Sequence, residues 1–260
     1  MTDTPLDAAH AAMEAAPEDD AARLRFYERL ADAELVLLLA EEADGDRITP
    51  QVFALEEGEV VLAFDREDRL TAFTEEISPY AALSGRALAT MLAGQNLGLG
   101  VNLGVAPSSI LIPGDAVAWL ATTLSETPDQ VEARPVEVTA PGDLPQALIT
   151  ALDAKLPTAA GLASYAFLAG ITYDTGAKTH MLAFIDPVPG AEDSLAQAAS
   201  EALIFSGLDA GQMDVAFFQA TDPIAAKLAK AALRFDLPTP IAEKVQVPPG
   251  SDPAKPPKLR

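Results

Sequence analysis

Short apolar runs alternate with amphipathic segments along this chain, and this alternation restricts the folds that it can adopt. The longest aliphatic run, residues 35–40, has six residues, enough for a buried strand but far below the roughly 20 needed to span a bilayer. Residues 20–33 carry apolar side chains at helical spacing, and residues 51–55 and 59–64 flank a Glu-Glu-Gly connection of hairpin type. Further helices are predicted at 67–73, 85–93 and after 113–115, with strands at 99–103 and 109–112.

The second half shows the same alternation, with four predicted strands and three predicted helices. Asp143 is predicted to cap the first of these helices, and Asp222 with Pro223 is predicted to start the last, which carries Phe235. The order strand, helix, two strands, helix and strand is that of a ferredoxin-like unit with one helix appended. The strands are predicted at 135–139, 162–173, 179–185 and 214–219, and the helices at 143–156, 192–206 and 222–235.

The predicted fold class is α+β with two domains, each a mixed or antiparallel sheet with helices packed on it. The first domain is expected over residues 20–127, after a flexible, acidic, alanine-rich leader at 1–19. The polar, proline-bearing stretch 125–129 is the best linker, so the boundary is expected near residues 125–132 and the ferredoxin-like second domain over 132–238. Residues 239–260 are proline-rich and basic, with little to bury, and are expected to be disordered.

The charge and the cysteine count exclude several function classes. Lys plus Arg is 17 and Asp plus Glu is 39, which gives a net charge of −22. Such a chain is repelled by phosphate backbones and anionic headgroups, so neither nucleic acid nor a membrane is an expected partner. The expected partner is a protein with a basic surface. The absence of cysteine removes disulfides, thiolate metal sites and cysteine nucleophiles. Residues 1–20 lack a signal-peptide pattern, so a cytoplasmic location is expected.

The motifs predict no catalytic residue, no cofactor site and no metal site. The glycine-rich run 94–104 contains Gly98 and Gly100 but has Leu103 where a dinucleotide loop needs its third glycine. Acidic turns at 44–46 and 65–68 lack the ligand set of an EF-hand, and neither His10 nor His180 has a sequence neighbour that suggests a metal site. A catalytic carboxylate pair stays open, because the sequence does not choose among 39 acids. The predicted binding residues are Arg86, Asn102 and Gly104, where a turn between strands lies near a cation.

Several segments resemble the SseB-like, or enhanced-serine-sensitivity, family of bacterial proteins. Residues 24–39 resemble the family's opening helix and strand, and residues 60–70 its strand followed by a polar turn and an acidic helix start. Residues 99–112 resemble its Asn-Pro-Gly turn between strands, with Leu103 in place of the proline. Residues 163–168, after Pro141 and Pro145, resemble its C-terminal domain. The resemblance supplies no catalytic residue and no cofactor.

Two hypotheses from different classes follow from these observations. The first is a non-catalytic cytoplasmic protein that binds a protein partner or a regulatory ligand, without enzymatic activity. The alternative is a small-molecule sensor or an enzyme linked to amino-acid (serine) metabolism, which the phenotype in the family name implies. The alternative predicts a concave pocket with a few convergent polar groups and perturbed carboxylates.

Overall fold

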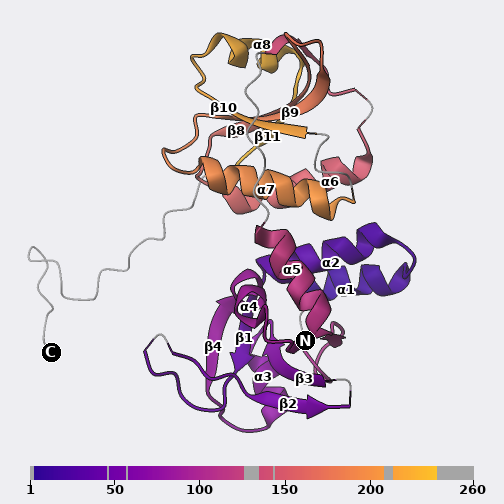
Figure 1. The fold of residues 1–260 in the computed structure, drawn as a ribbon, viewed down its shortest axis with the longest axis vertical. Coiled ribbons are helices and arrows are strands. Elements are labelled where there is room, and N and C mark those ends of the chain that lie inside the picture. Colours follow the sequence, from indigo (N-terminus) through magenta and orange to yellow (C-terminus); the bar gives the residue numbers. More distant parts are fainter. Residues whose placement is uncertain are drawn as a thin grey trace, which may run out of the picture.

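The chain forms two lobes, each built on one β-sheet (Figure 1). We call residues 5–125 the N-terminal lobe and residues 135–238 the C-terminal lobe. The architecture confirms the predicted α+β class with two sheets. The computed structural model describes residues 3–45, 47–56, 58–125, 135–142, 144–207 and 213–238.

The N-terminal lobe has a six-stranded sheet in which β3 pairs parallel with β5 and the other pairs are antiparallel. The strand order is β4-β1-β3-β5-β6, and β2 also pairs with β3 as a hairpin. Its elements are α1 (Pro5–Ala15), α2 (Asp20–Asp32), β1 (Glu34–Leu38), β2 (Val52–Leu55), β3 (Gly58–Phe64), α3 (Glu67–Thr74), β4 (Tyr80–Ser84), α4 (Gly85–Leu92), β5 (Gly98–Val101), β6 (Ile110–Ile112) and α5 (Gly114–Ser125).

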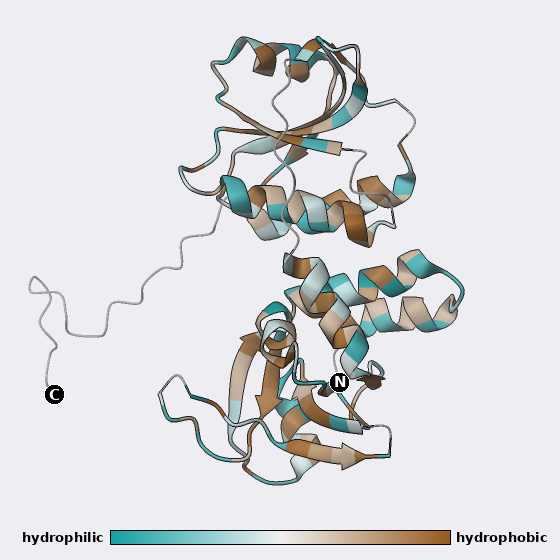
Figure 2. Cartoon of the chain, viewed as in Figure 1, coloured by the Kyte–Doolittle hydropathy of each residue, from teal (hydrophilic) through white to brown (hydrophobic). Residues whose placement is uncertain are grey.

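Both faces of this sheet are covered. Alternate residues of β1 and β3 point to opposite sides, so that Leu37 and Val61 pack under α1, α2, α4 and α5, while Leu62 and Phe64 pack against Leu70 of α3. Hydrophobic residues accordingly run along these strands, and polar residues gather on helix surfaces and loops (Figure 2). The four helices lie on the side of this sheet that faces the C-terminal lobe (Figure 1).

The C-terminal lobe places a five-stranded sheet between α6 and α7 on one face and α8 on the other. The strand order is β10-β9-β8-β11, and β7 pairs with β8 beside β11. Figure 1 shows α6 and α7 between this sheet and the N-terminal lobe. Its elements are β7 (Pro135–Thr139), α6 (Gln146–Lys155), a 3₁₀ turn η1 (Leu156–Ala159), β8 (Tyr165–Tyr173), β9 (Lys178–Ile185), α7 (Glu192–Phe205), β10 (Met213–Phe218), α8 (Pro223–Ala231) and β11 (Leu233–Asp236).

The ferredoxin-like arrangement expected for the second half is not confirmed. In a split βαβ unit another strand lies between the two strands that a helix connects. Here β7 and β8, which α6 connects, are antiparallel neighbours, and β9 and β10, which α7 connects, are parallel neighbours. The helix-connected strands are therefore adjacent, and the hairpin β8–β9 occupies the centre of the sheet.

The predicted flexible leader over residues 1–19 is wrong for residues 5–15, which form α1. Thr4 and Asp7 make a reciprocal capping box, and Pro5 occupies the first turn. Leu6 is buried in the N-terminal core, so α1 belongs to the lobe. The alanine-rich composition that suggested disorder supplies instead a helix with high intrinsic propensity.

Other differences concern short elements. The sequence pattern misses β4, and it places Phe235 in the last helix although this residue lies in β11. Asp222 is the N-cap residue of α8 as predicted, but its side chain accepts a hydrogen bond from the Gln219 N–H rather than from the helix. Asp143, linker residues 126–129 and the tail 239–260 lie outside the described residues.

The two lobes share apolar contacts as well as polar ones. Phe205, at the end of α7, is buried in the core of the N-terminal lobe, and its ring lies edge-on to Trp119 of α5 with the centroids 6.4 Å apart. Gln197 of α7 donates a hydrogen bond of 2.9 Å to the Leu124 carbonyl at the end of α5. Helix α7 therefore anchors the C-terminal lobe on the N-terminal one.

Candidate functional site

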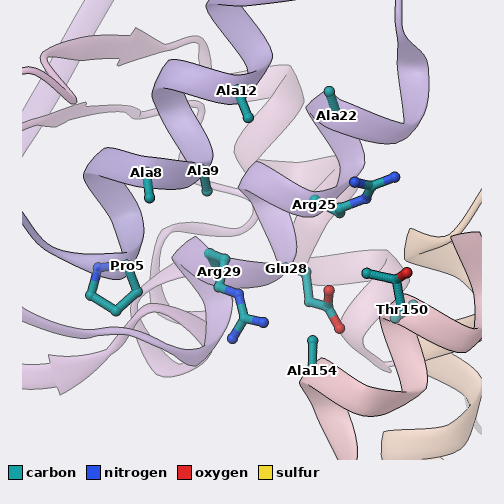
Figure 3. A pocket seen from close by; sticks show the side chains of 11 residues that line it. Pro5, Ala8, Ala9, Ala12, Ala22, Arg25, Glu28, Arg29, Thr150 and Ala154 are labelled. Atoms are coloured by element: carbon teal, nitrogen blue, oxygen red, sulfur yellow. The ribbon is translucent and has the colours of Figure 1, made fainter.

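A cavity of about 370 Å³ lies between α1 and α2 of the N-terminal lobe and α6 of the C-terminal lobe. We call it the interlobe cavity. Most of its wall consists of alanine methyl groups, and three charged side chains of α2 project from one side (Figure 3). Its lining residues are Pro5, Ala8, Ala9, Ala12, Ala22, Arg25, Glu28, Arg29, Thr150, Ala151 and Ala154.

Helix α2 positions the charged side chains because of its residue spacing. Asp19 caps the helix by accepting a hydrogen bond from the Ala21 N–H. Arg25, Glu28 and Arg29 follow at intervals of three and four, so they share one helix face, and Phe26 and Leu30 on the opposite face are buried in the core. The apolar face thus fixes the helix rotation that places these three side chains at the cavity, with Glu28 directed toward α6 (Figure 3).

Glu28 is the most unusual residue of the cavity. Its side chain is 2% exposed, and its Oε1 atom is buried without a hydrogen-bond partner among the described residues. Burial raises the pKa of Glu28 to about 7; Asp32 and Glu201 act in the same direction, while Lys155 and Arg29 oppose it. A buried carboxyl group without a hydrogen bond costs free energy, so its presence needs a physical reason.

An ion cluster that joins the lobes lies beside this carboxyl group. Asp32 of α2 accepts two contacts of 2.8 Å from Lys155 of α6, and Lys155 also pairs with Glu201 of α7 at 2.7 Å. Arg86 of α4 binds both oxygens of Glu201, at 2.6 and 2.8 Å. Although burial opposes ionisation of Glu201, the Arg86 and Lys155 contacts lower its pKa to about 2. We call Asp32, Arg86, Lys155 and Glu201 the interlobe ion cluster.

Arg25 and Arg29 differ from the cations of that cluster. Both guanidinium groups are half-buried at the cavity. Within the described part of the chain, neither forms a hydrogen bond or an ion pair. In a protein with 39 acidic and 17 basic residues, two unpaired guanidinium groups in one cavity are unexpected.

The three sequence-predicted binding residues belong to two separate networks. Arg86 is engaged in the interlobe ion cluster. Asn102 is buried with φ +52°; its amide donates to Ser108 Oγ at 2.8 Å and accepts from the Asp65 N–H at 3.2 Å. The Gly104 N–H donates to the Ser109 hydroxyl at 3.0 Å. Asn102 and Gly104 thus fix their own turn, and ligand binding at these residues stays a prediction.

The remaining sequence candidates have local partners. His10 is buried edge-on to Phe26, and His180 lies 2.8 Å from the Pro141 carbonyl oxygen through Nε2. Asp65, from one of the acidic turns, pairs with Arg69. Over the described residues there is no group of three or more His, Cys, Asp or Glu side chains that could hold a metal ion.

Sequence reasoning missed Arg25, Glu28 and Arg29, although their spacing was visible. The three-to-four spacing of residues 20–33 predicts the apolar face of a helix, and the same spacing places these charged residues together. The opposite wall could not be found in this way. Thr150 and Ala154 follow more than 120 residues later, and only the packing of α6 against α2 brings them to the cavity.

Glu28 should make the stability of the protein depend on pH. Its pKa is raised from 4.5 to about 7, so the native state holds a proton that the unfolded chain releases, and wild-type stability falls as the pH rises through this interval. Glu28→Gln removes this loss, so the variant should gain up to about 3 kcal/mol over wild type between pH 4.5 and 8. Urea unfolding at several pH values measures the difference. The exposed Glu14→Gln variant should follow the wild type, and a Glu28→Gln curve parallel to wild type would contradict the assignment.

The comparisons with known proteins concern the N-terminal lobe. Residues 6–119 match the SseB protein N-terminal domain. No curated protein and no solved structure matches the chain significantly. Among the described residues, no helix combines the length and apolar character needed to cross a membrane. The matched range begins inside α1 and ends within α5, so it spans the N-terminal sheet and its helices. Over residues 6–119, therefore, this chain is similar to the SseB family.

Proposed function

We propose that this protein binds a small regulatory molecule in the interlobe cavity and acts as a sensor. The observation that carries the proposal is the carboxyl group of Glu28, which is buried and lacks a hydrogen bond within the described structure. Groups of this kind cluster at functional sites, because a ligand can supply the missing partner. The small-molecule hypothesis also predicted a concave pocket with convergent polar groups and a perturbed carboxylate, and the cavity has these features.

The walls of the cavity suggest how binding would be transmitted. Ala9 and Arg25 belong to the N-terminal lobe and Ala151 and Ala154 to the C-terminal lobe, so a ligand would contact both. A ligand that binds only the closed arrangement of the lobes stabilises that arrangement. Glu28 also interacts electrostatically with Lys155, which holds the lobes together. Occupancy would therefore change the strength of the lobe contact.

A protein partner is a second candidate, favoured by the net charge of −22. Such a charge attracts a partner with a basic surface and accelerates the encounter. The two functions are compatible, because a change at the lobe contact could alter the surface that a partner binds.

We place this function in the bacterial cytoplasm and connect it with serine sensitivity, as the SseB resemblance implies. We also propose that residues 132–238 are an SseB-like C-terminal domain, with the boundary near residues 125–132. The two separate sheets support this division.

A ligand screen, combined with substitutions that fill the cavity, tests the proposed function. A library of small metabolites is screened by thermal unfolding, and we expect a ligand at hundredfold excess over its Kd to raise the Tm by about 5 °C or more. Ala154→Leu narrows the cavity from α6 and Ala12→Leu from α1, and each should abolish the shift. Ala226→Leu, on the exposed side of α8, is the matched control. A library that shifts no Tm, or a shift that survives both cavity variants, would reject the proposal.

A further inference from the structure

Cations outnumber acids around the interlobe cavity, whereas acids outnumber cations in the whole chain. The cavity and the interlobe ion cluster together contain four cations and three acids, whereas the chain has 17 basic and 39 acidic residues. The ion pairs engage Arg86 and Lys155 with Asp32 and Glu201. The positive charge left for a ligand is therefore that of Arg25 and Arg29.

Two guanidinium groups one helical turn apart repel each other unless an anion lies near both. Arg25 and Arg29 are separated by four residues on the same face of α2, and no described acidic side chain forms an ion pair with either. A guanidinium group presents a planar fork of donors that matches a carboxylate. In Figure 3 the two guanidinium groups point away from each other, with Glu28 between them, so each of them offers its own site for one end of a ligand that carries a carboxylate.

Glu28 specifies a second group on the same ligand. In Figure 3 its carboxyl group lies between the Arg29 guanidinium and Thr150, directed toward α6. No described residue donates a hydrogen bond to it. A hydroxyl or an ammonium group on the ligand would supply the missing donor.

The walls restrict the size of the ligand. A cavity of about 370 Å³ is near the lower end of ligand pockets and holds about a dozen water molecules at about 30 Å³ each. The methyl groups of Ala9, Ala151 and Ala154 offer apolar surface but no further polar group. A short aliphatic body fits between them.

We infer that the interlobe cavity binds a short-chain organic acid whose carboxylate lies at one of the two free guanidinium groups, that of Arg25 or that of Arg29, and whose hydroxyl or ammonium group donates to Glu28. This inference rests on the proposed function, because it names the ligand class of the same cavity. The shared chemistry is an anionic end and a donor end on a short aliphatic chain.

Calorimetric titration of the full chain with probe compounds tests the ligand class. Terminal hydroxy acids and terminal amino acids of three, four and five carbons carry both groups, whereas butyrate and butylamine carry one each. We expect at least one bifunctional compound to bind at least tenfold more tightly than both single-group compounds. Binding by the hydroxy series, the amino series or both identifies the donor.

Variants on one helix assign the groups. One of the two variants Arg25→Gln and Arg29→Gln should weaken binding tenfold or more, and that variant identifies the guanidinium group that binds the carboxylate. Arg23→Gln, whose side chain is 51% exposed and paired with Asp20, should leave the Kd unchanged. Glu28→Gln should weaken the amino series more than the hydroxy series, because an amide does not neutralise an ammonium ion.

The outcomes separate this inference from the proposed function. If library metabolites bind in the cavity but no bifunctional compound exceeds butyrate and butylamine, the ligand class is wrong and the proposed function stands. Unchanged Kd values in both arginine variants would also overturn the ligand class. If neither the library nor the probes bind, both proposals fail.

Discussion

Replacing Arg69 with alanine should lower the free energy of unfolding by about 3–5 kcal/mol, because it leaves buried carboxylates without their cation. Arg69 is 1% exposed, and its Nη1 atom lies 2.7 Å from Asp65 and 3.0 Å from Asp7. Asp7 also accepts hydrogen bonds from Ser108 and from the Thr4 N–H. Although burial alone would raise the pKa of Asp7, these contacts hold it far below its ordinary value. The Arg69 contacts therefore attach α1 to the sheet.

Urea unfolding followed by circular dichroism measures this effect. Arg66→Ala is the matched control, because Arg66 belongs to the same segment but forms an exposed ion pair with Asp68. Exposed pairs contribute about 0–1 kcal/mol, so this variant should remain close to wild type. Equal losses in the two variants would contradict a special role for the buried cluster. Asp7→Asn keeps the shape of the side chain but removes the charge that Arg69 neutralises, so it should also destabilise the lobe.

The Arg69 network illustrates where sequence reasoning succeeds and where it fails. The helix at 67–73 follows from local spacing and is confirmed as α3. The hairpin β2–β3, which depends on a short connection between two apolar runs, is also confirmed, as are the strands predicted at 162–173 and 179–185, which pair as β8 and β9. The structural role of Asp7 could not be predicted, because it depends on an ion pair with Arg69, which lies 62 residues away in the sequence. An alanine-rich segment without that partner has the composition of a disordered leader.

The missed strands have a similar cause. Strand β4 has five residues, lies at the sheet edge beyond β1, and half-buries only Ala81 and Leu83, too few positions for a distinctive alternating pattern. Strand β11 begins two residues after α8 ends, and the apolar spacing of the helix continues into Phe235. Both strands are defined by hydrogen bonds to distant strands, β1 and β8, rather than by their own pattern.

The sequence predicts what kind of site to expect but not where in the fold it lies. A pocket with a perturbed carboxylate followed from one of the two hypotheses, but its position depends on the packing of two lobes that the sequence does not reveal. Arg86 was singled out as a rare cation in the acidic first half, yet its partner Glu201 lies 115 residues away in the other lobe. Tertiary structure thus supplies the ion-pair partners of Arg86, and ligand binding at this residue stays a prediction.

Phe205→Ala should have the largest effect on the contact between the lobes. The ring of Phe205 is fully buried, and truncating such a residue costs about 3–5 kcal/mol. Although Phe205 ends α7 of the C-terminal lobe, its side chain lies in the N-terminal core beside Trp119. The variant should therefore weaken the lobe contact while each sheet keeps its own core.

Tryptophan fluorescence distinguishes loss of this contact from general destabilisation, because Trp119 is the only tryptophan of the chain. Trp119 is 40% exposed in the wild type, and removing the Phe205 ring exposes its indole further, so we expect emission of the native variant at longer wavelength and separate unfolding transitions for the two lobes. Phe167→Ala removes an equally large side chain from the α8 face of the C-terminal sheet and should destabilise that lobe without changing native Trp119 emission. If both variants leave the emission unchanged and unfold in one transition, Phe205 does not hold the lobes together. The cavity would then depend on the interlobe ion cluster for its shape.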